Sequence, residues 1–148
     1  MSRLTLDTNI FVYAIDASDA DRHRTAKRVI TFAARRDCVI MLQALAEFYY
    51  IATRKARLSG SQAKSYLREL QSIFAVALPG PGALEAAIGL SERYQVNFWD
   101  AMLLAVARQA GATTVLTEDL QDGQDYDGVR CVNPFGRTTA ELTALLRR

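Results

Sequence analysis

Short apolar segments of strand length alternate with helical patterns along this chain. The strand-like segments are at 3–7, 38–42, 73–78, 113–117 and 129–132. Apolar residues recur at helical spacing in the intervening segments, at 10–15, 20–36, 43–58, 61–72, 83–94 and 98–109, and again at 138–147. Strands that alternate with helices form a mostly parallel sheet that is covered on both faces. We therefore predict one α/β domain over residues 1–148, a three-layer α/β/α sandwich with about five strands.

Four acidic residues lie where strands end or helices begin. Asp7 closes the first strand, Glu47 lies one turn into the helix after the second, and Asp119 follows the strand at 113–117. Asp100 lies in the first turn of the strongly apolar helix at 98–109. Ligands in such sheets bind outside the carboxyl ends of the strands. Acids that converge there repel one another and need a bound cation or a proton.

Each acid alone also has an ordinary structural explanation. Asp7 can cap a turn, and Asp100, three residues after Asn97, resembles half of a capping box. Glu47 is harder to explain, because the residues three and four positions away on its helix include no salt-bridge partner. Four independent coincidences at one sheet edge are a less economical reading than a shared site. We therefore predict that the catalytic residues are Asp7, Glu47, Asp100 and Asp119, and that the metal ligands are Asp7, Asp100 and Asp119.

The predicted ligands are all oxygen donors. The only histidine, His23, lies in a basic helix, and the two cysteines lie in apolar runs without a CxxC motif. A zinc site and a Ser-His-Asp hydrolase are therefore unsupported. Hard oxygen ligands favour Mg²⁺, or alternatively Mn²⁺. Carboxylates around such an ion can activate a water molecule for attack on a phosphodiester.

Several polar and basic residues near the acids are predicted to support them. Thr8, Asn9 and Thr117 lie beside acids and can orient them, although turn capping explains Thr8 and Asn9 equally well. Arg54 lies seven residues after Glu47, on nearly the same helix face, and we predict that it contacts a substrate phosphate. Residues 1–74 hold 12 Lys/Arg and 7 acids, a net +5, whereas residues 75–148 hold 6 and 9, a net −3. A basic region beside an acidic site suits a polyanion.

The sequence carries no predicted export or membrane signal. It enters a strand pattern directly after Met-Ser-Arg, without a signal-peptide core, and no apolar run approaches the roughly 20 residues of a membrane span. Two unpaired buried thiols are expected in a reducing compartment. We therefore predict a cytoplasmic protein without a membrane partner.

Five sequence motifs, in order, resemble the PIN domain and, within it, VapC-like toxins of toxin-antitoxin pairs. They are Leu-Asp-Thr-Asn-Ile at 6–10, Gln-Ala-Leu-Ala-Glu-Phe-Tyr at 43–49, Phe-Trp-Asp-Ala at 98–101, Leu-Thr-Glu-Asp-Leu-Gln-Asp-Gly at 116–123 and Val-Asn-Pro-Phe at 132–135. The resemblance spans nearly the whole chain. The chain departs from the pattern at Asn97, where a small hydroxyl residue is common, but Asn caps a helix equally well.

The resemblance implies a PIN-like fold and a Mg²⁺-dependent endoribonuclease. It also implies a homodimer and inhibition by a cognate antitoxin. Asp7, Glu47, Asp100 and Asp119 match the acidic positions of the family, and Thr117 matches its hydroxyl position. The fourth acid varies most in such proteins, so Glu118 and Asp122 are alternatives to Asp119.

Two other functions remain open from the sequence. One is a non-catalytic RNA-binding or regulatory domain whose acids hold a structural metal ion. The other is a phosphatase with Asp7 as the nucleophile, but Asn9 stands where the second Asp of a DxD motif is expected.

Overall fold

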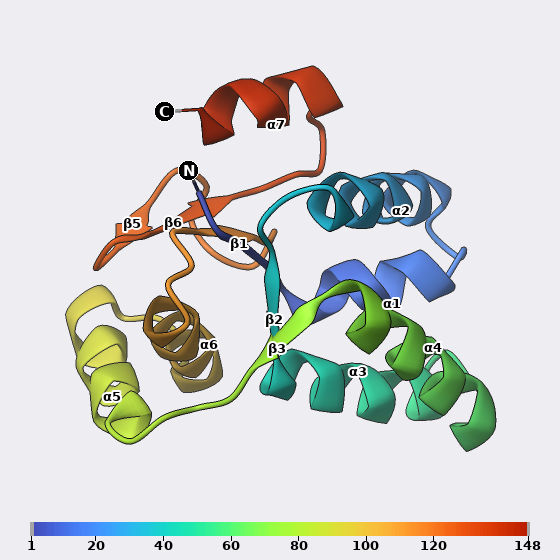
Figure 1. Ribbon diagram of the computed structural model, residues 1–148, viewed down its shortest axis with the longest axis horizontal. Helices are drawn as coiled ribbons and strands as arrows, with labels where there is room; N and C mark the ends of the chain where they lie inside the picture. The colour runs from blue at the N-terminus through green and yellow to red at the C-terminus, as the bar shows by residue number, and fades with distance from the viewer. Residues whose placement is uncertain (1, 148) are drawn as a thin grey trace.

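The computed structural model describes residues 2–147 and confirms the predicted α/β organisation (Figure 1). Strands and helices alternate along most of the chain. The elements are β1 (Leu4–Leu6), α1 (Thr8–Ile15), α2 (Ala20–Ala34), β2 (Val39–Met41), α3 (Leu42–Arg54), α4 (Gly60–Ile73), β3 (Ala75–Ala77), α5 (Ala83–Tyr94), α6 (Phe98–Gln109), β4 (Thr114–Leu116), β5 (Asp125–Tyr126), β6 (Val129–Val132) and α7 (Thr139–Leu146).

The central sheet has the order β1-β4-β6-β5. Strands β1, β4 and β6 are parallel, and β5 pairs with β6 in the antiparallel direction. Strands β2 and β3 form a separate parallel pair, which an isolated bridge between Leu4 and Cys38 joins to β1. The mostly parallel sheet agrees with the prediction, but its strands divide between a four-stranded sheet and a two-stranded one.

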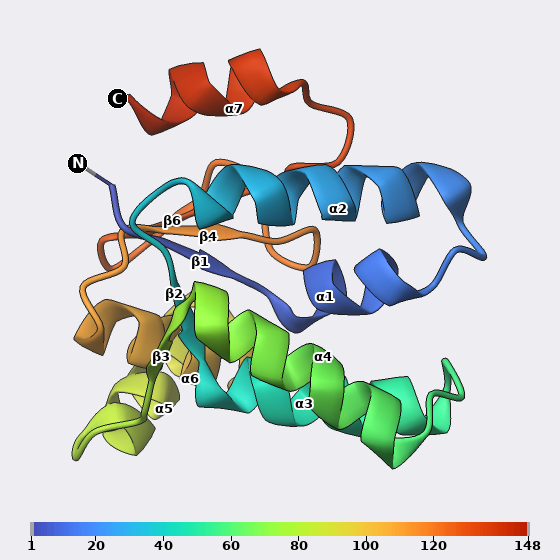
Figure 2. The same ribbon diagram turned by 45° about the vertical axis from the view of Figure 1, so that its right-hand side comes forward.

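Helices cover both faces of this sheet, as the sandwich prediction requires. Helices α2 and α7 lie on one side, whereas α3, α4, α5 and α6 lie on the other (Figures 1 and 2). Every residue of β1 and β4 is buried. Because strands in such a sheet are covered on both faces, the polar residues Thr5 of β1 and Thr114 of β4 are buried as well. None of the helices within residues 2–147 is long and apolar enough to cross a lipid bilayer.

Element bounds differ from the predictions where apolar runs are ambiguous. Helices α5 and α6 begin and end where the sequence predicted. The predicted strand at 73–78 is wrong at its start, because α4 continues through Ile73 and β3 is confined to Ala75–Ala77. Strand β5 lies within the predicted polar loop, where Asp127 and Gly128 have positive φ angles of 53° and 95° and close a tight hairpin.

Candidate metal centre

Two neighbouring strands bring the first pair of predicted site residues together. Leu6 of β1 pairs with Leu116 of β4, so the next residues along, Asp7 and Thr117, lie side by side. The Thr117 hydroxyl donates a hydrogen bond to Asp7 Oδ2 at 2.8 Å and accepts one from the Asp119 backbone N–H at 3.0 Å. One buried hydroxyl therefore fixes both acids.

Asp7 is buried, with 9% of its surface exposed. Its Oδ1 accepts a hydrogen bond from the Thr8 N–H at 2.7 Å, as the N-cap of α1. Burial is the main cause that raises the pKa of Asp7 to about 7, and the neighbouring Asp119 carboxyl adds to it, while the Thr117 hydrogen bond opposes it. Each of its two carboxylate oxygens thus accepts a hydrogen bond, and these bonds fix the orientation of Asp7.

Glu47 belongs to the same network. The sequence suggested that its side chain has no partner, but the structure shows two. Its Oε2 accepts a hydrogen bond from the Thr8 hydroxyl at 2.9 Å, and its Oε1 accepts one from Gln43 Nε2 at 3.0 Å. Gln43 also donates to the backbone carbonyl of Trp99 at 3.3 Å, which ties α3 to the start of α6. Gln43 was not among the predicted site residues, although its position four residues before Glu47 on a helix is the signal for such a pair.

Asp100 lies in the first turn of α6 and is half-buried. The side chain of Asn97 caps the helix by accepting the Trp99 N–H at 2.8 Å. No reciprocal bond from Asp100 to the Asn97 backbone is present in the described part of the chain, so the expected capping box does not form. Burial, followed by the charges of Asp119 and Glu47, raises the pKa of Asp100. The carboxylate of Asp100 therefore interacts with the charges of the other acids and does not cap the helix.

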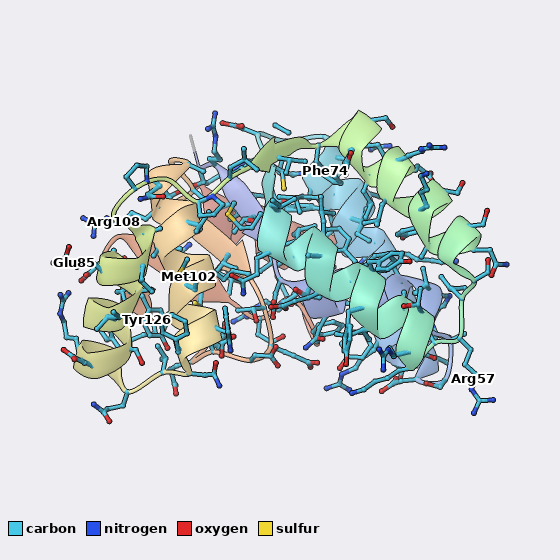
Figure 3. The ribbon with its side chains drawn as sticks, turned by 90° about the horizontal axis from the view of Figure 1, so that it is seen from below. Arg57, Phe74, Glu85, Met102, Arg108 and Tyr126 are labelled. Carbon is cyan, nitrogen blue, oxygen red and sulfur yellow. The ribbon has the colours of Figure 1, made fainter. Side chains whose placement is uncertain are left out.

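The apolar part of α6 holds Asp100 in place. Residues Leu103 to Ala107 are buried. Met102 is partly buried, packs against the core, and lies on the side of α6 that faces α3 in Figure 3. A residue carried by such a packed helix has little freedom to move.

Asp119 and its two acidic alternatives have different surroundings. Asp119 is exposed, and its Oδ2 accepts a hydrogen bond from Asn9 Nδ2 at 2.9 Å. Glu118 instead accepts hydrogen bonds from Tyr13 and, at 2.9 Å, from Arg22 Nη2. Asp122 pairs with Arg137 at 2.9 Å and accepts the Asn133 N–H at 2.8 Å. Both alternatives are thus engaged elsewhere, whereas Asp119 lies next to Asp7 and Asp100.

Arg54 does not join this group. Its guanidinium lies over the Tyr50 ring, 5.0 Å from the centroid. Within residues 2–147 it makes no ion pair or hydrogen bond with a site acid. A helix advances about 10 Å in the seven residues from Glu47 to Arg54, which carries the side chain along α3 and away from the sheet edge. The structure gives no support to its predicted contact with a phosphate at the acids.

The donor set fits Mg²⁺ or Mn²⁺ in its chemistry. The side chains at the sheet edge offer carboxylate, hydroxyl and amide oxygens, and burial raises the pKa of the nearby Cys131 thiol to about 12, so it stays protonated. The charge of Asp119 contributes to the raised pKa of Asp7, and the charges of Asp119 and Glu47 contribute to the raised pKa of Asp100. Within residues 2–147, no group of three or more His, Cys, Asp or Glu side chains is arranged so that it could hold a metal ion.

Comparison with known proteins adds a family. The model of the PIN domain family matches residues 4–122. The chain has no significant match among curated proteins.

Solved structures with this fold include several toxin-antitoxin proteins. Mycobacterium tuberculosis VapC20, described as a Sarcin-Ricin loop cleaving toxin, is 23% identical with a TM-score of 0.59, over 76% of this chain and 86% of that one. A toxin-antitoxin complex from Klebsiella pneumoniae is 22% identical with a TM-score of 0.65, over 89% and 98%. DNA-bound VapBC from Salmonella typhimurium is 19% identical with a TM-score of 0.66, over 90% and 99%. At these identities the likeness shows the shared fold.

Proposed function

The chain belongs to the PIN domain family, and we propose that it is a Mg²⁺-dependent endoribonuclease, the toxin of a type II toxin-antitoxin pair. The observation that carries the proposal is the hydrogen-bonded network at the sheet edge. In it, Thr117 joins Asp7 to Asp119, while Thr8 and Gln43 hold Glu47. A buried carboxylate beside a second acid costs folding free energy, and a sheet edge with a purely structural role gains nothing in return.

Each side chain of the network has a role in the proposed reaction. Asp7, Asp100 and Asp119 would hold the metal ion, with Glu47 beside them, and Mn²⁺ is an alternative ion. The ion would supply an activated water and stabilise negative charge on the scissile phosphate. Thr117 and Asn9 fix the orientation of Asp119, and Thr8 and Gln43 fix that of Glu47. Hydrolysis by water needs no nucleophile from the protein.

The proposed partners are RNA, a cognate antitoxin and a second copy of the chain, acting in the cytoplasm. Support for the antitoxin comes from fold neighbours that were solved as toxin-antitoxin complexes. Large apolar side chains are exposed on three helices, among them Tyr50 of α3 at 60%, Leu84 of α5 at 57% and Trp99 of α6 at 61%. The second copy of the chain stays a prediction from the family resemblance.

The decisive experiment compares RNA cleavage by the purified wild-type protein and an Asp100→Asn variant, with Mg²⁺ and with EDTA. We expect cleavage by the wild type with Mg²⁺ only, and none by the variant at equal folding. Steep salt-dependent RNA binding without cleavage in Mg²⁺ or Mn²⁺ would instead support the non-catalytic RNA-binding domain. Growth arrest on expression that is relieved by co-expression of a small DNA-binding protein encoded beside the gene would support the antitoxin partner, and arrest that no neighbouring gene relieves would count against it.

A further inference from the structure

A hollow is lined by residues 27–36 of the α2 segment and by Thr139 of α7. Helices α2 and α7 lie on the face of the sheet away from α3 and α6 (Figure 2). We call this hollow the α2 trough. Four of its lining side chains are basic, two are threonines, and none is acidic. The basic residues are Lys27, Arg28, Arg35 and Arg36. The site described above uses none of them.

Positive charge in the α2 trough is not neutralised. Within the described residues, Lys27 and Arg35 make no ion pair and no side-chain hydrogen bond. Arg36 donates to the Phe32 carbonyl at 2.9 Å, and its guanidinium lies 3.4 Å from the Phe32 ring centroid. Partial burial, followed by the charges of Arg147 and Arg35, lowers the pKa of Arg36. Like charges held together without counter-charges indicate a surface suited to an anionic ligand.

The trough continues toward the acids. A second hollow shares Arg28 with it and is lined by Arg22, Arg24 and Arg137. Arg22 Nη2 lies 2.9 Å from Glu118, the residue before Asp119. In this second hollow the arginines are matched by acids, since Arg24 pairs with Asp21 and Arg137 pairs with Asp122. The free positive charge therefore begins beyond Arg28 and extends along α2 away from the acids.

The spacing of these residues makes a stripe along one helix face. Lys27, Thr31 and Arg35 follow one another at intervals of four residues, which returns to nearly the same face at each step. The eight residues from Lys27 to Arg35 advance about 12 Å, long enough to meet more than one phosphate of a nucleic-acid strand. Phe32, the aromatic lining residue, is buried at 4% exposure. A lining with four basic side chains and no acid favours a polyanion as the ligand.

We propose that the α2 trough binds the phosphodiester backbone of the RNA and guides the strand past Arg28 toward the acids. The proposal rests on the proposed ribonuclease function, because it assigns a surface to the same substrate. Arg54, for which the sequence predicted a phosphate contact, lies on another helix, α3, and its contact stays a prediction. Phosphate contacts of this kind set affinity and position without reading base sequence.

Binding is tested apart from cleavage in an Asp100→Asn background with EDTA. The probe is a fluorescein-labelled single-stranded RNA of mixed sequence, and its anisotropy gives the affinity over a range of salt. Lys27→Gln/Arg35→Gln removes two charges at exposed helix positions that tolerate glutamine. We expect the plot of log affinity against log salt to become shallower by about 1.4, or about 0.7 per lost phosphate contact, and affinity at low salt to fall about tenfold.

The matched control is Lys64→Gln/Arg68→Gln, which removes the same charge from exposed positions of α4. We expect its salt slope to stay at the value of the background protein. The proposal is overturned if the salt slope changes equally in both variants or does not change in the α2 variant. It is also overturned if the α2 variant binds polyglutamate more weakly than the background protein but binds RNA equally well. If the wild-type protein cleaves RNA but the α2 variant binds RNA as well as the background protein does, the trough proposal fails and the ribonuclease proposal stands. If RNA binding depends on the trough but the wild-type protein never cleaves RNA, the ribonuclease proposal alone fails.

Discussion

The side-chain amide of Gln43 donates one hydrogen bond to Glu47, four residues later on α3, and another to the backbone carbonyl of Trp99, the residue before Asp100. One amide thus connects α3, which carries Glu47, to α6, which carries Asp100. Replacement by leucine keeps the helix but removes both bonds. We expect Gln43→Leu to lower kcat about tenfold, with a small change in KM, since partners that orient site carboxylates commonly contribute that much.

The matched control for Gln43→Leu is Gln71→Leu, an exposed position on α4 with no side-chain hydrogen bond in the described structure. The metal concentration for half-maximal cleavage gives a second readout, and we expect it to rise only for Gln43→Leu. Equal behaviour of the two variants would show that the Gln43 bonds do not position Glu47.

Thr117 is buried at 2% exposure, and its single hydroxyl serves both Asp7 and Asp119. Thr117→Val keeps the shape but leaves the carboxylate and the N–H without that partner. We expect it to lower the free energy of unfolding by about 1–3 kcal/mol and to reduce cleavage, whereas Thr117→Ser keeps the hydroxyl and most of the activity. Urea unfolding and an RNA cleavage assay on both variants would separate these effects, and a serine variant as impaired as valine would contradict the role of the hydroxyl.

The three acids of the loop after β4 are expected to differ in role. Asp119→Asn should abolish most cleavage and leave the fold intact, because its partner is the exposed Asn9 amide. Asp122→Asn should retain cleavage and lose a little stability, because its carboxylate pairs with Arg137 at the surface. Cleavage rates and thermal melts of the two variants test the assignment, which fails if Asp122→Asn is the inactive one.

Asp7 should make the stability of the metal-free protein depend on pH. Its pKa rises from 3.8 to about 7 on folding, so the folded state holds a proton that the unfolded state releases. Stability from this group is therefore complete below about pH 4 and is lost as the pH rises through about 7. In EDTA, urea unfolding at about pH 5 and pH 8 should show this loss in the wild type and a flatter profile in Asp7→Asn.

Metal binding should oppose that loss, because an ion favours the charged carboxylate. At about pH 8, Mg²⁺ at 100 times its dissociation constant would stabilise the wild type by about 2.7 kcal/mol. A wild type and an Asp7→Asn variant with parallel pH profiles would show that Asp7 does not titrate as its surroundings imply.

The sequence predicted the parts of the site that depend on strand ends and helix starts. Asp7 and Asp119 could be placed at one edge because parallel strands end together, and α6 could be bounded by Asn97 and Gly111. Gln43 was not predicted, because its amide carries no charge and so does not stand out beside the acids. Its second partner is a backbone carbonyl on another helix, which the sequence does not place near it. The roles of Glu118 and Asp122 depend on distant arginines, which only the folded structure brings near.

Two other misses have a physical cause in short elements. Strand β5 consists of Asp125 and Tyr126, too few residues for a periodic pattern. Ile73 continues a helix although its neighbours form an apolar run, because an apolar run alone does not distinguish a strand from the end of a helix.

Strand β1 has three residues, and its register against β4 places Asp7 directly beside Thr117. Successive side chains of a strand point to opposite faces, so removal of one residue from β1 would turn the Asp7 carboxylate away from its partners. Conservative exchanges among Leu4, Thr5 and Leu6 would leave that direction intact. The active edge is thus specified by the number of residues before Asp7 as firmly as by their identity, and a one-residue deletion that spares every acid would inactivate the protein as fully as the loss of Asp7.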